Sequence, residues 1–291
     1  MNVAIVSDSH SGITKHNTTG INIFILQVPI LLNGELKPDM ETISFSKFDK
    51  MIYNNYKIEC NPTSAKAIKE IWNNLLMVKK YDYIIHIPYS SMLGDMYEIC
   101  YTMSQSYNGK VIVVDNKRLG VTLKSALFSA KNMAKKGIAP KEIANTLTNS
   151  SKDSSLYILI DNPKYVKNNC KLEMTKEANS ALSSPKPIFE LKDGILDLSK
   201  KCRSRKKALK IMLKNLEKDL KTKFKPLVDA NEMELFISYS SKIEECIIIK
   251  EKLNSMFPNI PVTYTDELPI CLCTHFGLGS VMIGCSKVFK C

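Results

Sequence analysis

The chain has 291 residues, a formal net charge of +12 and 44% apolar residues. This apolar fraction supports a hydrophobic core and excludes a disordered protein, and the length suggests one large or two ordinary domains. The longest apolar stretch, residues 21–32, is too short and too interrupted to span a bilayer, which needs about 20 apolar residues. The first six residues are too few for a signal peptide, so we expect a cytoplasmic protein.

Over residues 1–150, short apolar runs alternate with segments of helical periodicity. The expected strands cover residues 3–6, 23–32, 83–87 and 110–115, and the expected helices cover residues 44–53, 65–78, 121–135 and a segment that begins at Pro140. This alternation predicts a parallel, doubly wound α/β layer. Ligands bind such sheets at the carboxyl ends of the strands, where Ser7, Ser90 and Asn116 are expected to lie.

The first of these ends carries the polar turn Ser7-Asp8-Ser9. Asp8 is either a turn residue or a group that orients a neighbouring loop.

The most informative helix start is Asn61-Pro62-Thr63-Ser64. Pro62 disfavours helix at the residue before it, and Thr63 or Ser64 is a suitable N-cap. The free N–H groups and the positive end of the helix dipole can bind an anion there. The alternative is that Thr63 only caps the helix.

Polar residues 149–155 mark a predicted domain boundary, followed by a strand at residues 156–160. Residues 200–225 then hold twelve Lys or Arg against Glu217 and Asp219, a local charge of +10. Charge confined to one segment favours a single acidic partner surface over general nucleic-acid binding. A solvated helix face explains the same composition.

Near the C-terminus, His275 lies between an apolar segment, expected as a strand, and the Gly-rich turn that contains Gly277 and Gly279. The nine cysteines are scattered, and only Cys271 and Cys273 are close together, so we expect free thiols and no metal site.

Several of these segments, in this order, resemble motifs of the DegV family of bacterial fatty-acid-binding proteins. The family has Thr-Ser-Gln-Pro at residues 63–66, Ser-Ser-x-Leu-Ser-Gly-Thr-Tyr at 90–97, Lys-Gly-Gly-Arg near 167–171, Arg-Thr-Arg-Lys-Lys-Ala at 203–208 and His-x-Gly-Pro-Gly at 275–279. This chain keeps Thr63-Ser64, Ser90-Ser91 and His275 but has Gly94 where the family has its third serine. It also has Lys171 in place of the family arginine, without the bidentate fork.

The resemblance implies two α/β domains: a doubly wound parallel sheet over residues 1–153 and a mixed-sheet domain over residues 154–291. It also implies a fatty-acid carboxylate site and a docking face for a partner or an anionic membrane. The carboxylate residues would be Thr63, Ser64, Ser90, Ser91, Gly94 and His275, with Ser90, Ser91 or a backbone N–H replacing the hydroxyl lost at Gly94. The docking residues would be Arg203, Arg205, Lys206, Lys207 and Lys171.

The family is similar to the binding subunits of bacterial fatty acid kinases. The implied function is therefore a carrier that holds a long-chain fatty acid, such as palmitate, in a tunnel between the domains. It would present the carboxylate to a separate kinase subunit for acyl phosphate formation, without a cofactor, a metal, a nucleotide site or a nucleic-acid partner.

Two other classes of function stay open at this point. A Ser/His hydrolase acting on acyl esters would use Ser90 or Ser91 with His275 and Asp8, although no G-x-S-x-G elbow is present. A basic nucleic-acid-binding module would show steeply salt-dependent DNA binding.

Overall fold

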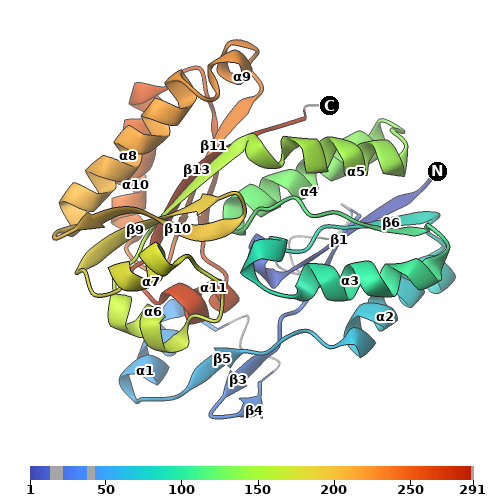
Figure 1. Ribbon diagram of the computed structural model, residues 1–291, viewed down its shortest axis with the longest axis horizontal. Helices are drawn as coiled ribbons and strands as arrows, with labels where there is room; N and C mark the ends of the chain where they lie inside the picture. Colours follow the sequence, from blue (N-terminus) through green and yellow to red (C-terminus); the bar gives the residue numbers. More distant parts are fainter. Residues whose placement is uncertain (14–21, 38–42, 290–291) are drawn as a thin grey trace.

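The computed structural model describes residues 1–13, 22–37 and 43–289, which form two main sheets with helices packed around them (Figure 1). One sheet is parallel, with the strand order β2-β1-β6-β7, and the other is mixed, with the order β10-β9-β8-β13-β11-β12. The predicted fold class is confirmed: a doubly wound parallel sheet is followed by a mixed sheet. The boundary between residues 153 and 154 stays a prediction.

The parallel sheet consists of β1 (Val3–Asp8), β2 (Ile23–Leu26), β6 (Tyr83–His86) and β7 (Val111–Val113). The mixed sheet consists of β8 (Ser154–Leu159), β9 (Lys186–Lys192), β10 (Ile195–Cys202), β11 (Met233–Tyr239), β12 (Val262–Glu267) and β13 (Val281–Lys287). A small antiparallel sheet contains β3 (Ile30–Leu32), β4 (Glu35–Leu36) and β5 (Ile58–Cys60). The single strand region predicted at residues 23–32 is therefore wrong. Pro29 interrupts it, because proline has no N–H to donate within a sheet.

The helices are α1 (Phe45–Tyr53), α2 (Ala65–Asn73), α3 (Met96–Ser104), α4 (Gly120–Lys135), α5 (Pro140–Asn149), α6 (Pro163–Asn169), α7 (Lys176–Ala181), α8 (Arg205–Lys221), α9 (Lys225–Asp229), α10 (Ile243–Met256) and α11 (Ile270–Phe276). Short 3-10 turns include η1 (Ser9–Ser11) and η5 (Ser91–Leu93), and a π-helical turn (Asn74–Val78) extends α2. None of the helices in the described part of the chain is long and apolar enough to cross a membrane.

Alternating side chains of β1 form two separate cores, one on each face of the parallel sheet. Ile5 packs with Leu127 of α4 and Ile143 of α5, and Val6 packs with Trp72 of α2 on the opposite face. This follows from the two-residue period of a strand, and it explains why residues 3–6 of β1 are all apolar.

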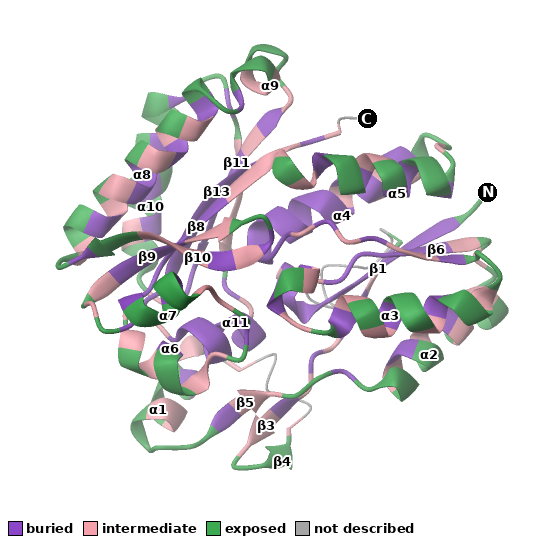
Figure 2. Ribbon diagram, viewed as in Figure 1, coloured by how far each residue is buried: buried purple, intermediate pink, exposed green. Residues whose placement is uncertain are grey.

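Helix α4 joins the two halves of the molecule. It contacts β1 of the parallel sheet and also β8, β11 and β13 of the mixed sheet. Figure 2 shows it buried along most of its length. The mixed sheet is covered by α8 and α10 on its outer face, and by α6, α7 and α11 on the face turned toward the small sheet (Figure 1).

The segment before the Gly-rich turn differs from its prediction. Residues 270–276 form α11 and not a strand. Every residue of this helix is buried, so its apolar run lacks the one-sided period that identifies a surface helix. As a result, His275 lies on the last turn of a buried helix.

Candidate binding site between the two sheets

A cavity of about 440 Å³ lies where β1 and β6 end, between the parallel sheet and α11. Its volume is within the range of about 300–1,000 Å³ that is usual for small-molecule sites. One part of the cavity wall is aliphatic, and the other part is formed mainly by polar side chains. The aliphatic residues are Val28, Leu31, Pro62, Leu93, Met96, Ile99 and Leu172. The remaining lining residues are His10, Glu59, Cys60, Asn61, Thr63, Tyr89, Gly94, Asp95, Lys171 and His275.

The cavity collects four of the predicted site residues from distant parts of the sequence. Thr63, Gly94, Lys171 and His275 all line it. Gly94 lies close under the Tyr89 ring, and a Cβ at this position would come within 2.7 Å of the Tyr89 hydroxyl. The close approach of the Tyr89 side chain therefore favours a residue without a Cβ here.

The three predicted serines do not line the cavity. Ser64 is exposed, and its hydroxyl accepts the N–H of Ala67 as the N-cap of α2. The Ser90 hydroxyl accepts the N–H of Met92 at 3.3 Å, and the Ser91 hydroxyl donates to Asp115 at 2.6 Å. Their hydroxyls are used in capping and turn formation. The substitution of Ser90 or Ser91 for the hydroxyl lost at Gly94 stays a prediction.

Thr63 has the opposite arrangement. Its side chain is only 3% exposed, and its Oγ1 has no hydrogen-bond partner within the described part of the chain. Because Ser64 is the N-cap, the Thr63 hydroxyl is not needed to cap α2. A buried hydroxyl without a partner costs free energy, so the Thr63 hydroxyl is available to donate a hydrogen bond to a ligand.

His275 is held as a neutral ring with a defined tautomer. The backbone N–H of Lys171 donates to its Nδ1 at 3.2 Å, so the proton of the neutral imidazole is on Nε2. Burial lowers the pKa of His275 well below its usual value, and electrostatic interaction with the neighbouring His10 and Lys171 lowers it further. His275 can therefore donate a hydrogen bond to an anion but does not neutralise its charge.

His10 is a lining residue that the sequence reasoning missed. Its Nδ1 lies 2.7 Å from Oδ1 of Asp8, and its ring stacks on His275 with the centroids 5.6 Å apart. Asp8 also accepts the backbone N–H groups of His10 and Tyr89. Burial alone would raise the pKa of Asp8, but its electrostatic interaction with His10 and these hydrogen bonds bring it below its ordinary value. Asp8 is thus an ionised group that orients His10 rather than a simple turn residue.

The catalytic arrangement of a serine hydrolase is not assembled. Asp8 binds His10 and not His275, and Ser91 is paired with Asp115. Within the described residues, no hydrogen bond joins Ser90 or Ser91 to His275. The nucleophile, base and orienting acid of the hydrolase hypothesis therefore do not form one chain of hydrogen bonds.

The predicted docking residues separate into two groups. Arg203, Lys206 and Lys207 are exposed at the start of α8. Arg205 instead lies inside an ion-pair network: its Nη1 donates to Asp161 at 2.8 Å, and its Nε donates to Glu245 at 2.9 Å. Its guanidinium is not available to a partner, because both carboxylates already hold it.

Lys171 lies at the rim of the cavity, apart from α8. Its Nζ is 3.6 Å from the Glu59 carboxylate, and its side chain is 57% exposed. Hydrogen bonding to Lys57 is the main cause that lowers the pKa of Glu59, and the charge of Lys171 adds to it. Lys171 therefore contributes positive charge to the cavity mouth rather than to the surface around α8.

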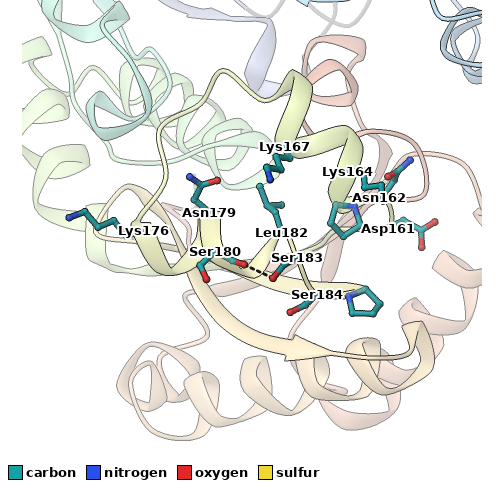
Figure 3. A pocket seen from close by; sticks show the side chains of 12 residues that line it. Asp161, Asn162, Lys164, Lys167, Lys176, Asn179, Ser180, Leu182, Ser183 and Ser184 are labelled. Atoms are coloured by element: carbon teal, nitrogen blue, oxygen red, sulfur yellow. Dashed lines mark hydrogen bonds between the residues drawn. The ribbon is translucent and has the colours of Figure 1, made fainter.

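A second hollow, of about 880 Å³, lies between α6, α7 and the loop that follows α7 (Figure 3). Nine of its twelve lining residues are polar or charged, including Lys164, Lys167 and Lys176, and the only apolar side chains among the twelve belong to Leu182 and two prolines. None of the predicted site residues lines it. The smaller cavity between the sheets is the better candidate for an amphipathic ligand.

Comparison with known proteins places this geometry in context. A family model described as "uncharacterised protein, DegV family" matches residues 2–288. A DegV domain-containing protein of Staphylococcus aureus strain N315 is 24% identical over 280 residues, which cover 95% of this chain and 96% of that protein.

Solved structures share the fold over nearly the whole chain. DegV of Bacillus subtilis, described as a fatty acid binding protein, matches with a TM-score of 0.81 and 19% identity, covering 99% of each chain. A stearic acid-binding protein of Eubacterium ventriosum matches with a TM-score of 0.82 and 16% identity, covering 98% of each chain. At these identities the structural likeness establishes the fold.

Proposed function

This chain belongs to the DegV family, and from that premise we propose that it is a carrier that binds one long-chain fatty acid in the cavity between its two sheets. The proposal rests mainly on one observation: buried hydrogen-bond donors and aliphatic side chains line the same cavity. Thr63 and His275 converge there although they are 212 positions apart in the sequence. Relatives that share the fold are described as fatty acid binding proteins.

The aliphatic wall would hold the acyl tail. Each buried CH₂ group contributes about 0.8 kcal/mol, so a chain of palmitate size has ample binding free energy even if only part of it is enclosed. Leu93, Met96 and Ile99 would form one side of this wall and Val28 and Leu31 the other.

The carboxylate would lie at the polar end of the cavity. A buried anion without partners is very costly, and the Thr63 hydroxyl and the Nε2–H of His275 would each donate to it. A neutral His275 orients the carboxylate and leaves its negative charge largely intact. This state suits a carrier whose ligand is phosphorylated by another protein.

We further propose that a separate fatty acid kinase subunit supplies the nucleotide and converts the presented carboxylate to an acyl phosphate in the cytoplasm. Arg203, Lys206 and Lys207 would form the docking face for an acidic surface of this kinase or, transiently, for an anionic membrane. Arg205 is left out of this face because Asp161 and Glu245 hold it. Exposed charges of this kind mainly set the association rate and its salt dependence.

The first experiment is native mass spectrometry of gently purified protein, followed by extraction and identification of the released lipid. We expect one bound acyl chain of roughly palmitate size. A protein that is lipid-free and also fails to bind a fluorescent fatty acid would refute the proposal.

The docking face is tested by reversing two charges, Arg203→Glu with Lys206→Glu. The matched control, Lys214→Glu with Lys218→Glu, makes the same charge change on exposed residues further along α8. The first pair should weaken binding to the kinase or to anionic vesicles at low salt and leave the lipid content unchanged. Equal weakening by both pairs would show that only net charge matters, and loss of lipid would place the segment in the pocket.

A further inference from the structure

Two buried polar atoms of the cavity have no hydrogen-bond partner among the described residues: Nε2 of His10 and Oγ1 of Thr63. His10 is 3% exposed and Thr63 is 3% exposed. Both residues line the same cavity. Buried polar atoms without partners are rare in folded proteins, and two in one cavity indicate a polar ligand group that binds between them.

The orientation of His10 is fixed by Asp8. The carboxylate oxygen 2.7 Å from Nδ1 can only accept, so Nδ1 carries a proton, and Nε2 is the atom left for the cavity. The His10 ring is also held between its neighbours, with its centroid 4.5 Å from that of Tyr89 and 5.6 Å from that of His275. In the neutral ring, Nε2 is an acceptor and would repel a carboxylate. In the protonated ring, it is a charged donor.

His275 adds no positive charge to the cavity, because its Nδ1 accepts the Lys171 N–H and the ring is neutral. Asp8 is already ionised and would oppose a second carboxylate unless a positive charge lay between the two. We propose that His10 is a head-group ligand that takes up a proton from solvent when the fatty acid binds, so that a His10 imidazolium bridges Asp8 and the ligand carboxylate. This inference rests on the proposed function and adds proton-linked binding to it.

The other titratable groups around His10 do not supply this proton. Burial is the largest of the causes that raise the pKa of Tyr89, which keeps its hydroxyl neutral. Hydrogen bonding to Lys57 lowers the pKa of Glu59, which stays ionised. Asp95 and Lys171 are exposed at the mouth, and Cys60 bonds with Thr274. His10 is the ring whose free nitrogen changes from acceptor to donor on protonation.

The test is isothermal titration of lipid-free protein with a soluble fatty acid, in pairs of buffers that differ in ionisation enthalpy, from about pH 6 to about pH 9. The difference in heat between the buffers gives the number of protons taken up. We expect the parent to take up close to one proton per fatty acid at the higher pH values. Its affinity should fall by up to about tenfold per pH unit there, as linkage to one proton requires. The fatty alcohol of the same length has no carboxylate and should bind without proton uptake.

The variant is His10→Gln, whose amide can donate a hydrogen bond near the position of Nε2 but cannot take up a proton. It should bind the fatty acid about tenfold or more weakly at low pH, with no proton uptake and a flat pH profile, while its affinity for the alcohol is kept. The alcohol affinity thus shows that the variant has a folded cavity.

The outcomes separate this inference from the proposed function. A parent that binds neither fatty acid nor alcohol overturns the function itself. A parent that binds the fatty acid without proton uptake at any pH in the range overturns the role of His10 and leaves the function standing. This second result depends on the parent alone, so it holds even if His10→Gln does not fold.

Discussion

Replacing Thr63 by valine removes the hydroxyl and keeps the branched shape of the side chain. In the free protein this hydroxyl is buried without a partner, so its loss should leave the free energy of unfolding unchanged or raise it by up to about 1 kcal/mol. In the complex the hydroxyl would donate to a carboxylate. Losing a hydrogen bond to a charged group costs about 1.5–3 kcal/mol, which is roughly a 10- to 150-fold loss of affinity. Thr63→Val should therefore be a stable protein that binds fatty acid poorly.

The assay compares urea unfolding of lipid-free protein with fatty-acid affinity by fluorescence. The matched control is Ser64→Ala, which removes the neighbouring hydroxyl, the N-cap of α2, and should lower stability by about 1 kcal/mol with little change in affinity. His275→Asn keeps an acceptor for the Lys171 N–H and removes the Nε2 donor. Combined with Thr63→Val, it should be non-additive, because both groups hold one carboxylate. The reasoning is refuted if Thr63→Val binds like the parent, or if it is clearly less stable than the parent.

Three further predictions concern the ion-pair network, acid stability and the tail. Arg205→Gln should lower the free energy of unfolding by about 2–3 kcal/mol, because it removes the partner of the partly buried Glu245 and one of the partners of Asp161. The exposed Arg203→Gln should change it by less than about 0.5 kcal/mol, and equal effects in urea unfolding would contradict the assignment. Burial lowers the pKa of His86 from 6.5 to about 4, so the neutral ring contributes its full stability above pH 6.5. This contribution, on the order of 3 kcal/mol in total, is lost as the pH falls toward 4. A His86→Gln variant should lose less unfolding free energy than the parent over this range, and equal losses would contradict the prediction. Ile99→Trp should fill the cavity and weaken the binding of fatty acid and fatty alcohol alike. The control Tyr101→Trp, exposed on the same helix, should weaken the binding of neither ligand. Retained affinity in Ile99→Trp would place the acyl tail elsewhere.

The fold could be predicted from the sequence where apolar periods were long or were interrupted by strong turn signals. The strand at the start of the chain and the helix that begins after Ser64 are of this kind. The errors occurred where a short apolar run is ambiguous. Apart from Thr274 and His275, residues 270–276 are apolar on all sides because α11 is buried on all sides, and periodicity cannot distinguish such a helix from a buried strand.

The candidate site was predicted in part. Thr63 and His275 were found through the resemblance to the DegV family, and both line the cavity. Ser90 and Ser91 were chosen for the same reason but turn their hydroxyls to local partners, which residue types alone do not reveal. His10 was missed, although the spacing Asp8-x-His10 directly after a buried strand was a usable signal, because a carboxylate two residues before a histidine can hold its ring.

The distribution of partnerless polar atoms connects stability with function in this chain. In the described residues, eight buried side-chain nitrogen or oxygen atoms have no hydrogen-bond partner, and two of them, on His10 and Thr63, belong to residues that line the same cavity. Each such atom carries a desolvation cost in the free protein, and a carboxylate that accepts from both would recover this free energy on binding. The ligand should then stabilise the fold beyond what its buried tail supplies. A fatty alcohol, with its weaker and uncharged head group, should raise the melting temperature less than the fatty acid of equal length at equal saturation.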